Sequence, residues 1–221
     1  MLAAVGHVLP LAVAFALSSI PIMATILILL SKNRNRSSIP FLIGWILGIA
    51  LVLVVLTWIA QAVPGTVPRQ SQVALGSALI VIGVALIALS VFNWTRGRRN
   101  PASGVPRWLE AVSSFGPWSS LGFALLLNVR PKAILLSAAA GLSLRGDGLS
   151  PGEVAVVVLI YTLVAASTVA IPIIARLVAP RRTEIPLVNA RKWLEANNRI
   201  VSALILVLVG FVVIADGLTR L

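Results

Sequence analysis

The segment LLLNVRPKAILL, residues 125–136, places an amide, two cations and a proline inside an otherwise apolar run. Asn128, Arg130 and Lys132 are its polar side chains, and Pro131 stands between the two cations. Charged Arg and Lys side chains donate hydrogen bonds and accept none, so this residue set is suited to holding an anion. The chain offers no His–carboxylate cluster and no nucleophile beside a base, so we expect a binding site and no enzyme.

A second apolar run carries a similar interruption near the start of the chain. Pro21 lies in the stretch ALSSIPIMATILILL, where Ser18, Ser19 and Thr25 surround it. The hydroxyls of these three residues are candidates to line the same cavity as the cations. Serine and threonine in membrane helices also commonly bond their own backbone or allow close packing, which is the alternative for each of them.

The two cations need compensation if their segment crosses a membrane, because each costs about 2.5–3.5 kcal/mol at mid-depth. The chain contains six carboxylates: Glu110, Asp147, Glu153, Glu184, Glu195 and Asp216. Five fall in connections or at the ends of apolar runs, and Asp216 is about one turn from the end of the last run. We therefore expect the cargo to supply the anion, assisted by the carbonyl near Leu127 that Pro131 leaves without a helical partner. Alternatively, Arg130 and Lys132 bond carbonyls and polar groups of other helices and fix their packing.

Composition identifies the elements that must position these residues. Of 221 residues, 59% are hydrophobic and only 11% are charged, where a soluble domain has about 25% charged. Apolar runs of about 20 residues are long enough to cross a bilayer. Six such runs predict an all-α integral membrane protein: 3–31, 39–63, 72–94, 117–144, 152–178 and 198–218. The absence of cysteine removes thiolate metal sites, and no metal or other cofactor is expected.

Prolines recur at matching places in the two halves of the chain. Pro21 and Pro131 are 110 residues apart, and Pro40 and Pro151 are 111 residues apart. Three spans per half would make the halves enter the membrane in opposite directions. Broken helices at matching positions of inverted halves indicate a transporter site near the midplane. We predict one membrane domain over 1–221, with repeat 1 at about 1–97, a cytoplasmic linker at about 98–116 and repeat 2 at about 117–221. The alternative is that the prolines match by chance, because proline is common in membrane helices.

The net charge is +12, and the basic residues that produce it fall mostly on one side of the predicted membrane domain. Thirteen basic residues follow spans one, three and five: Lys32, Arg34, Arg36, Arg96, Arg98, Arg99, Arg107, Arg176, Arg181, Arg182, Arg191, Lys192 and Arg199. Only Arg69, Arg145 and Arg220 fall on the other side. The positive-inside rule then places the three basic connections in the cytoplasm and both termini outside. This charge predicts contact with anionic membrane lipids, and no nucleic-acid partner is expected.

Two nearly identical pentapeptides, RWLEA at 107–111 and KWLEA at 192–196, precede spans four and six. Each suits a short amphipathic helix in the headgroup region, with tryptophan as the anchor. If these helices dock other proteins, the chain would act as a scaffold for a lipid-synthesis complex. His7, the one histidine, is expected to have a surface role.

The motif Asn128, Pro131, Lys132 and Ala133, followed by the AAAG of 138–141, is similar to that of the LysE exporter superfamily. Together with SSIP in the first span and the KWLEANNRIVSALILVLVGFVVIADG end, it most resembles the mycobacterial Sap/GAP-type proteins, which address sulfolipid or glycopeptidolipid towards the cell surface. Arg130 replaces the asparagine that commonly precedes Pro-Lys, and the first span lacks the Pro-Gly-Pro of many amino-acid exporters.

The resemblance implies a bacterial inner-membrane exporter or translocation factor for an anionic or amphiphilic cargo, such as a cell-envelope glycolipid. A homo-oligomer and cytoplasmic lipid-synthesis partners are further expectations. Amino-acid or small-solute export is the alternative transport reading.

Overall fold

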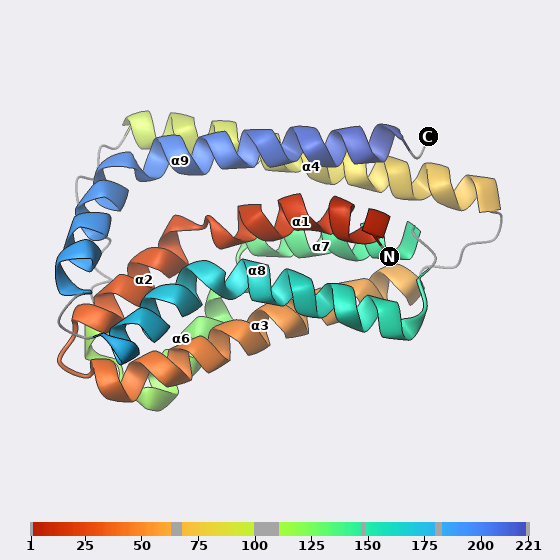
Figure 1. The fold of residues 1–221 in the computed structure, drawn as a ribbon. Coiled ribbons are helices and arrows are strands. Elements are labelled where there is room, and N and C mark those ends of the chain that lie inside the picture. Colours follow the sequence, from red (N-terminus) through yellow and green to blue (C-terminus); the bar gives the residue numbers. More distant parts are fainter. Residues whose placement is uncertain (1, 63–67, 100–110, 147–148, 180–182, 220–221) are drawn as a thin grey trace.

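The computed structural model describes residues 2–62, 68–99, 111–146, 149–179 and 183–219 (Figure 1). The described residues form helices and no strands, which confirms the all-α prediction. In chain order they are α1 (Leu2–Ala16), α2 (Ser19–Leu30), α3 (Arg34–Ala62), α4 (Pro68–Arg99), the 3-10 helix η1 (Ala111–Ser114), α6 (Pro117–Leu127), α7 (Pro131–Gly146), α8 (Pro151–Val178) and α9 (Glu184–Leu218).

Two of these helices, α3 and α8, are each long and apolar enough to cross a membrane. The pairs α1–α2 and α6–α7 meet the same test as pairs, with bends of 49° and 61° at their breaks. This makes up to four spans in the described parts of the chain. Helices α4 and α9 contain the shorter apolar stretches Gly76–Phe92 and Ala203–Leu218.

The outward faces of the helices suit a hydrocarbon environment. Many large apolar side chains point away from the bundle, among them Leu51, Leu159 and Leu204. Exposed tryptophans lie near opposite ends: Trp118 is in the first turn of α6, and Trp58 is close to the end of α3. Tryptophan at both ends of an apolar belt is typical of membrane–water interfaces. The chain is therefore a multi-pass membrane protein.

The core of the bundle contains an aromatic cluster from three helices. Phe15 of α1 lies with its ring 5.9 Å from that of Trp45 in α3 and 6.1 Å from that of Tyr161 in α8. All three are almost completely buried. Edge-to-face and tilted pairs at these distances are favourable beyond the apolar area that they bury. The cluster holds α1, α3 and α8 around the α1–α2 break.

Helices α4 and α9 form an antiparallel pair along one side of the bundle (Figure 1). Glycines line their contact at a spacing of seven residues, Gly76 and Gly83 on α4 and Gly210 and Gly217 on α9. A Cβ added at Gly83 would come 2.7 Å from the carbonyl oxygen of Gly210. Small residues therefore let the two backbones approach closely, as is common between membrane helices.

Helix α9 is longer than the 198–218 span predicted for it. It begins at Glu184 and runs continuously to Leu218, so the KWLEA segment belongs to it. Figure 1 shows its first part lying across the end of the bundle before the helix turns to run along α4. Trp193 in this first part is exposed, in keeping with the interfacial anchor expected there. The RWLEA segment lies outside the described residues except for Ala111, as does most of the 98–116 linker.

The start of α1 and the end of α9 lie at the same end of the bundle (Figure 1). At that end the Arg145 side chain of α7 donates a hydrogen bond to the carbonyl of Ala60 in α3. Helix α8 begins there with a capping box, in which Ser150 and Glu153 bond each other's backbone N–H groups. The connection before α3 and the start of α9 lie at the opposite end, which we call the basic end. The described basic residues at this end include Lys32, Arg34, Arg36 and Arg176.

Candidate functional site

The first break separates α1 from α2, four residues before Pro21. Pro21 occupies the third position of α2, where a missing N–H leaves no helical bond unmade. In an unbroken helix its ring would clash with the carbonyl of Leu17. The chain avoids that clash by leaving the helix at Ser18, which is extended with φ −92° and ψ 115°. The break is therefore a local consequence of the proline.

The second break separates α6 from α7 at Asn128–Arg130. Pro131 is the first residue of α7, the position that proline prefers in helices. As predicted, the carbonyl of Leu127 has no partner at Pro131. The Nε of Arg130 donates to it instead, at 2.7 Å. One cation of the site thus also stabilises the break that positions it.

The two breaks meet around a small cavity. It is lined by Phe15, Ser18, Arg130, Lys132, Ala133 and Leu136. Its volume is about 10 Å³, which is close to the least that holds one water molecule. In this conformation the cavity is therefore too small for a ligand larger than water, and a larger ligand requires the helices around it to move.

Arg130 and Lys132 have no acidic partner at this cavity. Neither makes an ion pair with a carboxylate of the described residues. Asp216 lies near the end of α9, at the end of the bundle opposite the basic end, where Ser143 donates to it at 2.9 Å. Two half-buried cations side by side repel each other and lose hydration. An anion entering the cavity would relieve both costs.

The other predicted site residues lie near the breaks but do not line this cavity. Asn128 is completely buried, and its Nδ2 donates to the carbonyl of Ala124 at 2.8 Å. Its amide packs on Gly48 of α3. We expected unwinding to bring Asn128 to the same cavity as the cations, but the turn before Pro131 directs it to α3. Thr25 bonds the carbonyl of Pro21 at 2.8 Å, as helical threonines commonly do. Ser19 and Pro21 are buried at the start of α2.

Several buried polar atoms in the core have no hydrogen-bond partner. They are the Oδ1 of Asn128, the Nε1 of Trp45 and the hydroxyls of Ser120, Ser137 and Tyr161. The Tyr161 hydroxyl faces the Ser137 side chain, but not in hydrogen-bonding geometry. A buried polar atom left unsatisfied costs about 1–3 kcal/mol. Such groups are available to water or to a ligand when the helices separate. Trp45 and Ser137 gave no signal in the sequence.

An apolar groove runs between α1 and α9 beside the first break. Its volume is about 580 Å³. It is lined only by apolar residues: Gly6, Leu9, Pro10, Val13, Ala14, Leu17, Leu204, Ile205, Leu208 and Val209. Leu17, which lines the groove, is the residue before Ser18 in the chain, and Ser18 lines the cationic cavity. The groove is apolar along its whole lining, and the two sites share no lining residue.

His7 has a polar partner that the sequence did not reveal. Its Nε2 lies 3.9 Å from Oδ1 of Asp216, whose other oxygen accepts the bond from Ser143. The three residues come from α1, α9 and α7, and their separations along the chain left no pattern to find. Within the described parts of the chain, no three His, Asp or Glu residues come together as metal ligands do.

A family model described as Sap, sulfolipid-1-addressing protein, matches residues 8–219. No curated protein and no solved structure matches the chain. The match takes in both helix breaks, the cationic cavity and the α4–α9 pair.

Proposed function

Because the chain belongs to the sulfolipid-1-addressing protein family, we propose that it translocates an anionic, lipid-like cargo across a bacterial inner membrane. The cargo class is a cell-envelope glycolipid with a sulfate, phosphate or carboxylate group. The family match supports a role in glycolipid transport or addressing. The cationic cavity is the proposed place where the anionic group passes the centre of the membrane.

One observation carries this proposal: Arg130 and Lys132 line one small cavity with Ser18, and no described carboxylate forms an ion pair with them. Intramembrane cations are expensive and usually mark a pathway for substrate or ions. A purely structural pair would be expected to have its hydrogen bonds satisfied by protein groups. Arg130 has one such bond, to Leu127, and Lys132 has none among the described residues.

The surroundings of the cavity favour an amphiphile over a small solute. The α1–α9 groove offers hydrocarbon contact up to the residue before Ser18. An acyl chain can remain in that groove, or in the bilayer beyond it, while the headgroup occupies the cavity. Once the helices open, the unsatisfied polar atoms of Asn128, Ser137 and Tyr161 form hydrogen bonds with the sugar or sulfate of the cargo.

We also propose that the chain has six spans in two inverted repeats. Each half offers a broken helix pair, then a long helix, then a helix with a shorter apolar stretch. These are α1–α2, α3 and α4 in the first half, and α6–α7, α8 and α9 in the second. Alternating access would follow from rocking one half against the other around the two breaks. The basic end is then cytoplasmic and both chain ends are outside.

The protein acts as a transporter and not as an enzyme, without a metal or cofactor, and its partners are membrane lipids. Cytoplasmic lipid-synthesis proteins and a second copy of the chain are its proposed associates. Small-solute export is less suited to a chain that also has an apolar groove beside the first break. A scaffold would depend on the exposed first part of α9 and not on Lys132.

The test is a deletion strain of the native host complemented with the wild type or with Lys132→Gln. Surface lipids are extracted and compared by mass spectrometry. We expect the deletion to lose one class of anionic surface glycolipid, the wild type to restore it, and Lys132→Gln to restore about a tenth or less. That figure assumes the loss of a charged hydrogen bond worth about 1.5–3 kcal/mol.

The matched control is Lys32→Gln, which removes the same charge in the connection before α3. It should restore the lipid fully. The amount of protein in the membrane is measured for each variant. An unchanged lipid profile in the deletion strain, with altered amino-acid efflux, would contradict the proposal and favour the solute exporter. Loss of membrane protein in Lys132→Gln together with loss of the lipid would favour a structural role for Lys132.

A further inference from the structure

A second cavity opens at the basic end of the bundle, away from the helix breaks. It has a volume of about 400 Å³ and lies where the end of α2, the start of α3 and the end of α8 come together. Its lining is Leu29, Arg34, Asn35, Ser38, Arg176 and Leu177. Two cations, an amide, a hydroxyl and two leucines thus surround one pocket, and none of these lining residues is acidic.

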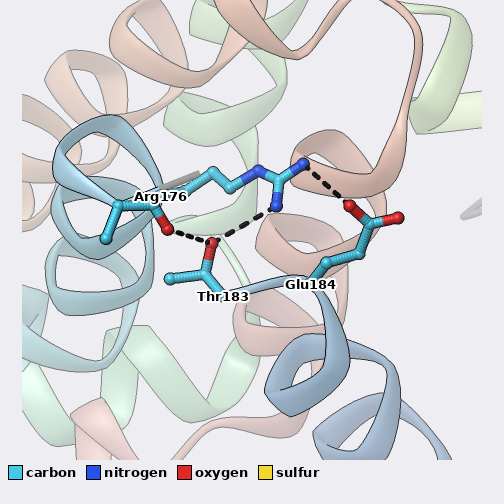
Figure 2. Close-up of polar contacts among 4 residues, drawn as sticks. Arg176, Thr183 and Glu184 are labelled. Carbon is cyan, nitrogen blue, oxygen red and sulfur yellow. Dashed lines mark hydrogen bonds and ion pairs between the residues drawn. The ribbon is translucent and has the colours of Figure 1, made fainter. Parts of the chain in front are cut away.

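Arg176 is the buried member of this set. The residue is only 6% exposed, although it lies in the last turn of a membrane helix. Figure 2 shows its guanidinium reaching from α8 to the start of α9. There Nη1 lies 3.3 Å from the Thr183 hydroxyl, and Nη2 lies 3.5 Å from a carboxylate oxygen of Glu184.

Neither of these two contacts is short. Hydrogen bonds between a guanidinium and a carboxylate are usually about 2.7–2.9 Å long, well below the 3.5 Å seen here. The Glu184 side chain is 63% exposed, and an exposed ion pair contributes little. An anion held closer to Arg176 would therefore make a stronger contact than Glu184 does.

The start of α3 adds positive potential from the other side of the pocket. Helix α3 begins at Arg34, so its first backbone N–H groups and the positive end of its dipole face this region. Arg34 and Asn35 are both exposed side chains of that first turn. Together with Arg176 they offer charged donors and an amide on opposite walls, as a tetrahedral oxyanion requires.

The leucines distinguish the source of that oxyanion. Leu177 is 50% exposed at the rim, and Leu29 closes the inner wall at the end of α2. A pocket with a cationic wall and an apolar rim, placed where membrane helices end, matches the junction between a lipid headgroup and its chains. We propose that this pocket binds the phosphate or sulfate ester headgroup of an anionic membrane lipid between Arg34 and Arg176.

This site goes beyond the proposed transport function, because it is separate from the cavity of Arg130 and Lys132 and its binding can be measured without transport. It places an anionic headgroup against the contacts of Arg176 with Thr183 and Glu184, which join the end of α8 to the start of α9. A bound lipid would take over Arg176 from Glu184 and release the start of α9.

The chain contains no cysteine, so Leu177→Cys creates a unique labelling position at the rim. The purified full-length protein, carrying an environment-sensitive fluorophore there, is titrated in neutral detergent micelles. The probes are dioctanoyl phosphatidylglycerol, dioctanoylglycerol and sodium sulfate. We expect saturable binding of phosphatidylglycerol at least about tenfold tighter than of dioctanoylglycerol, which lacks the phosphate, from the charged hydrogen bonds alone.

Variants in the labelled background locate the site. Arg34→Gln, on an exposed position that leaves the fold intact, should weaken phosphatidylglycerol binding about tenfold. The double variant Arg176→Gln with Glu184→Gln should do the same without leaving a carboxylate unpaired. Arg36→Gln is the matched control, because it removes a charge from the same turn outside the pocket. Lys132→Gln should also bind as the wild type does, which separates this site from the transport proposal.

Three results would overturn the proposal. Arg36→Gln could weaken binding as much as Arg34→Gln, which would mean general surface attraction. Dioctanoylglycerol could bind as tightly as phosphatidylglycerol, which would remove the role of the oxyanion. Sodium sulfate could saturate the signal and displace the lipid at equal concentration, which would assign the pocket to a free anion.

Discussion

Replacing Gly48 by alanine tests the packing that directs Asn128 away from the cavity. A Cβ at Gly48 would overlap the Asn128 amide, lying 2.9 Å from its Cγ and closer still to its Nδ2. Moving the amide breaks its bond to Ala124 inside the core, which costs about 1–3 kcal/mol. Crowding of the new Cβ against its neighbours lowers the free energy of unfolding by about 1–3 kcal/mol more. The better helix propensity of alanine raises it by about 1 kcal/mol.

The net expectation is a loss of about 3 kcal/mol in the free energy of unfolding. For a chain of this size that lowers the melting temperature by roughly 6–12 °C. Thermal unfolding in detergent micelles, followed by circular dichroism, measures it. Gly122→Ala on α6 is the control, because nothing lies within 4 Å of a Cβ there. It should be neutral or slightly stabilising.

A double variant isolates the contact itself. In an Asn128→Ala background there is no amide to displace, so adding Gly48→Ala should cost little. Equal melting temperatures for Gly48→Ala and Gly122→Ala in the native background would refute the packing of Asn128 on α3. So would additive losses in the double variant.

Three further outcomes are expected from the packing seen here. Gly83→Ala should lower stability by about 1–3 kcal/mol, since its Cβ would meet the Gly210 carbonyl; a melting temperature equal to that of the wild type would contradict the close α4–α9 approach. Ser143→Ala removes the 2.9 Å bond to the Asp216 carboxylate, so native-state proteolysis near the end of α9 should accelerate about tenfold. An unchanged rate would show that this bond does not stabilise the end of α9. Thr25→Val should leave transport within twofold, because its hydroxyl bonds its own helix; a large loss would return Thr25 to the cargo pathway.

Local chemistry made the helix breaks predictable. Proline lacks an N–H and clashes with the carbonyl four residues back, so Pro21 and Pro131 each fix a break in the sequence itself. The same reasoning predicted that the Leu127 carbonyl would take part in compensating the cations. The hydrophobic runs also located the helices, although α9 begins 14 residues before the expected span, because the KWLEA segment joins it without interruption.

Contacts between distant segments were not predictable. On an unbroken helix Asn128 shares a face with Lys132, but the three-residue turn before Pro131 rotates the amide onto Gly48. His7 and Asp216 approach only because α1 and α9 pack together. The sequence places Arg176 among the basic residues of a cytoplasmic connection. Its burial depends on how α2, α3 and α8 converge, which the sequence did not reveal. Position along a chain carries no information on such convergence.

Translocation by the purified protein in liposomes tests the central claim most directly. A fluorescent sulfated glycolipid and its desulfated counterpart are placed in one leaflet, and their appearance in the other is followed by quenching. The wild type should move the sulfated lipid and leave the neutral one at the background rate. Arg130→Gln with Lys132→Gln should slow the sulfated lipid at least about tenfold, while Lys32→Gln should not. Transport of the sulfated lipid at the wild-type rate by the double variant would contradict a cationic pathway through the two helix breaks.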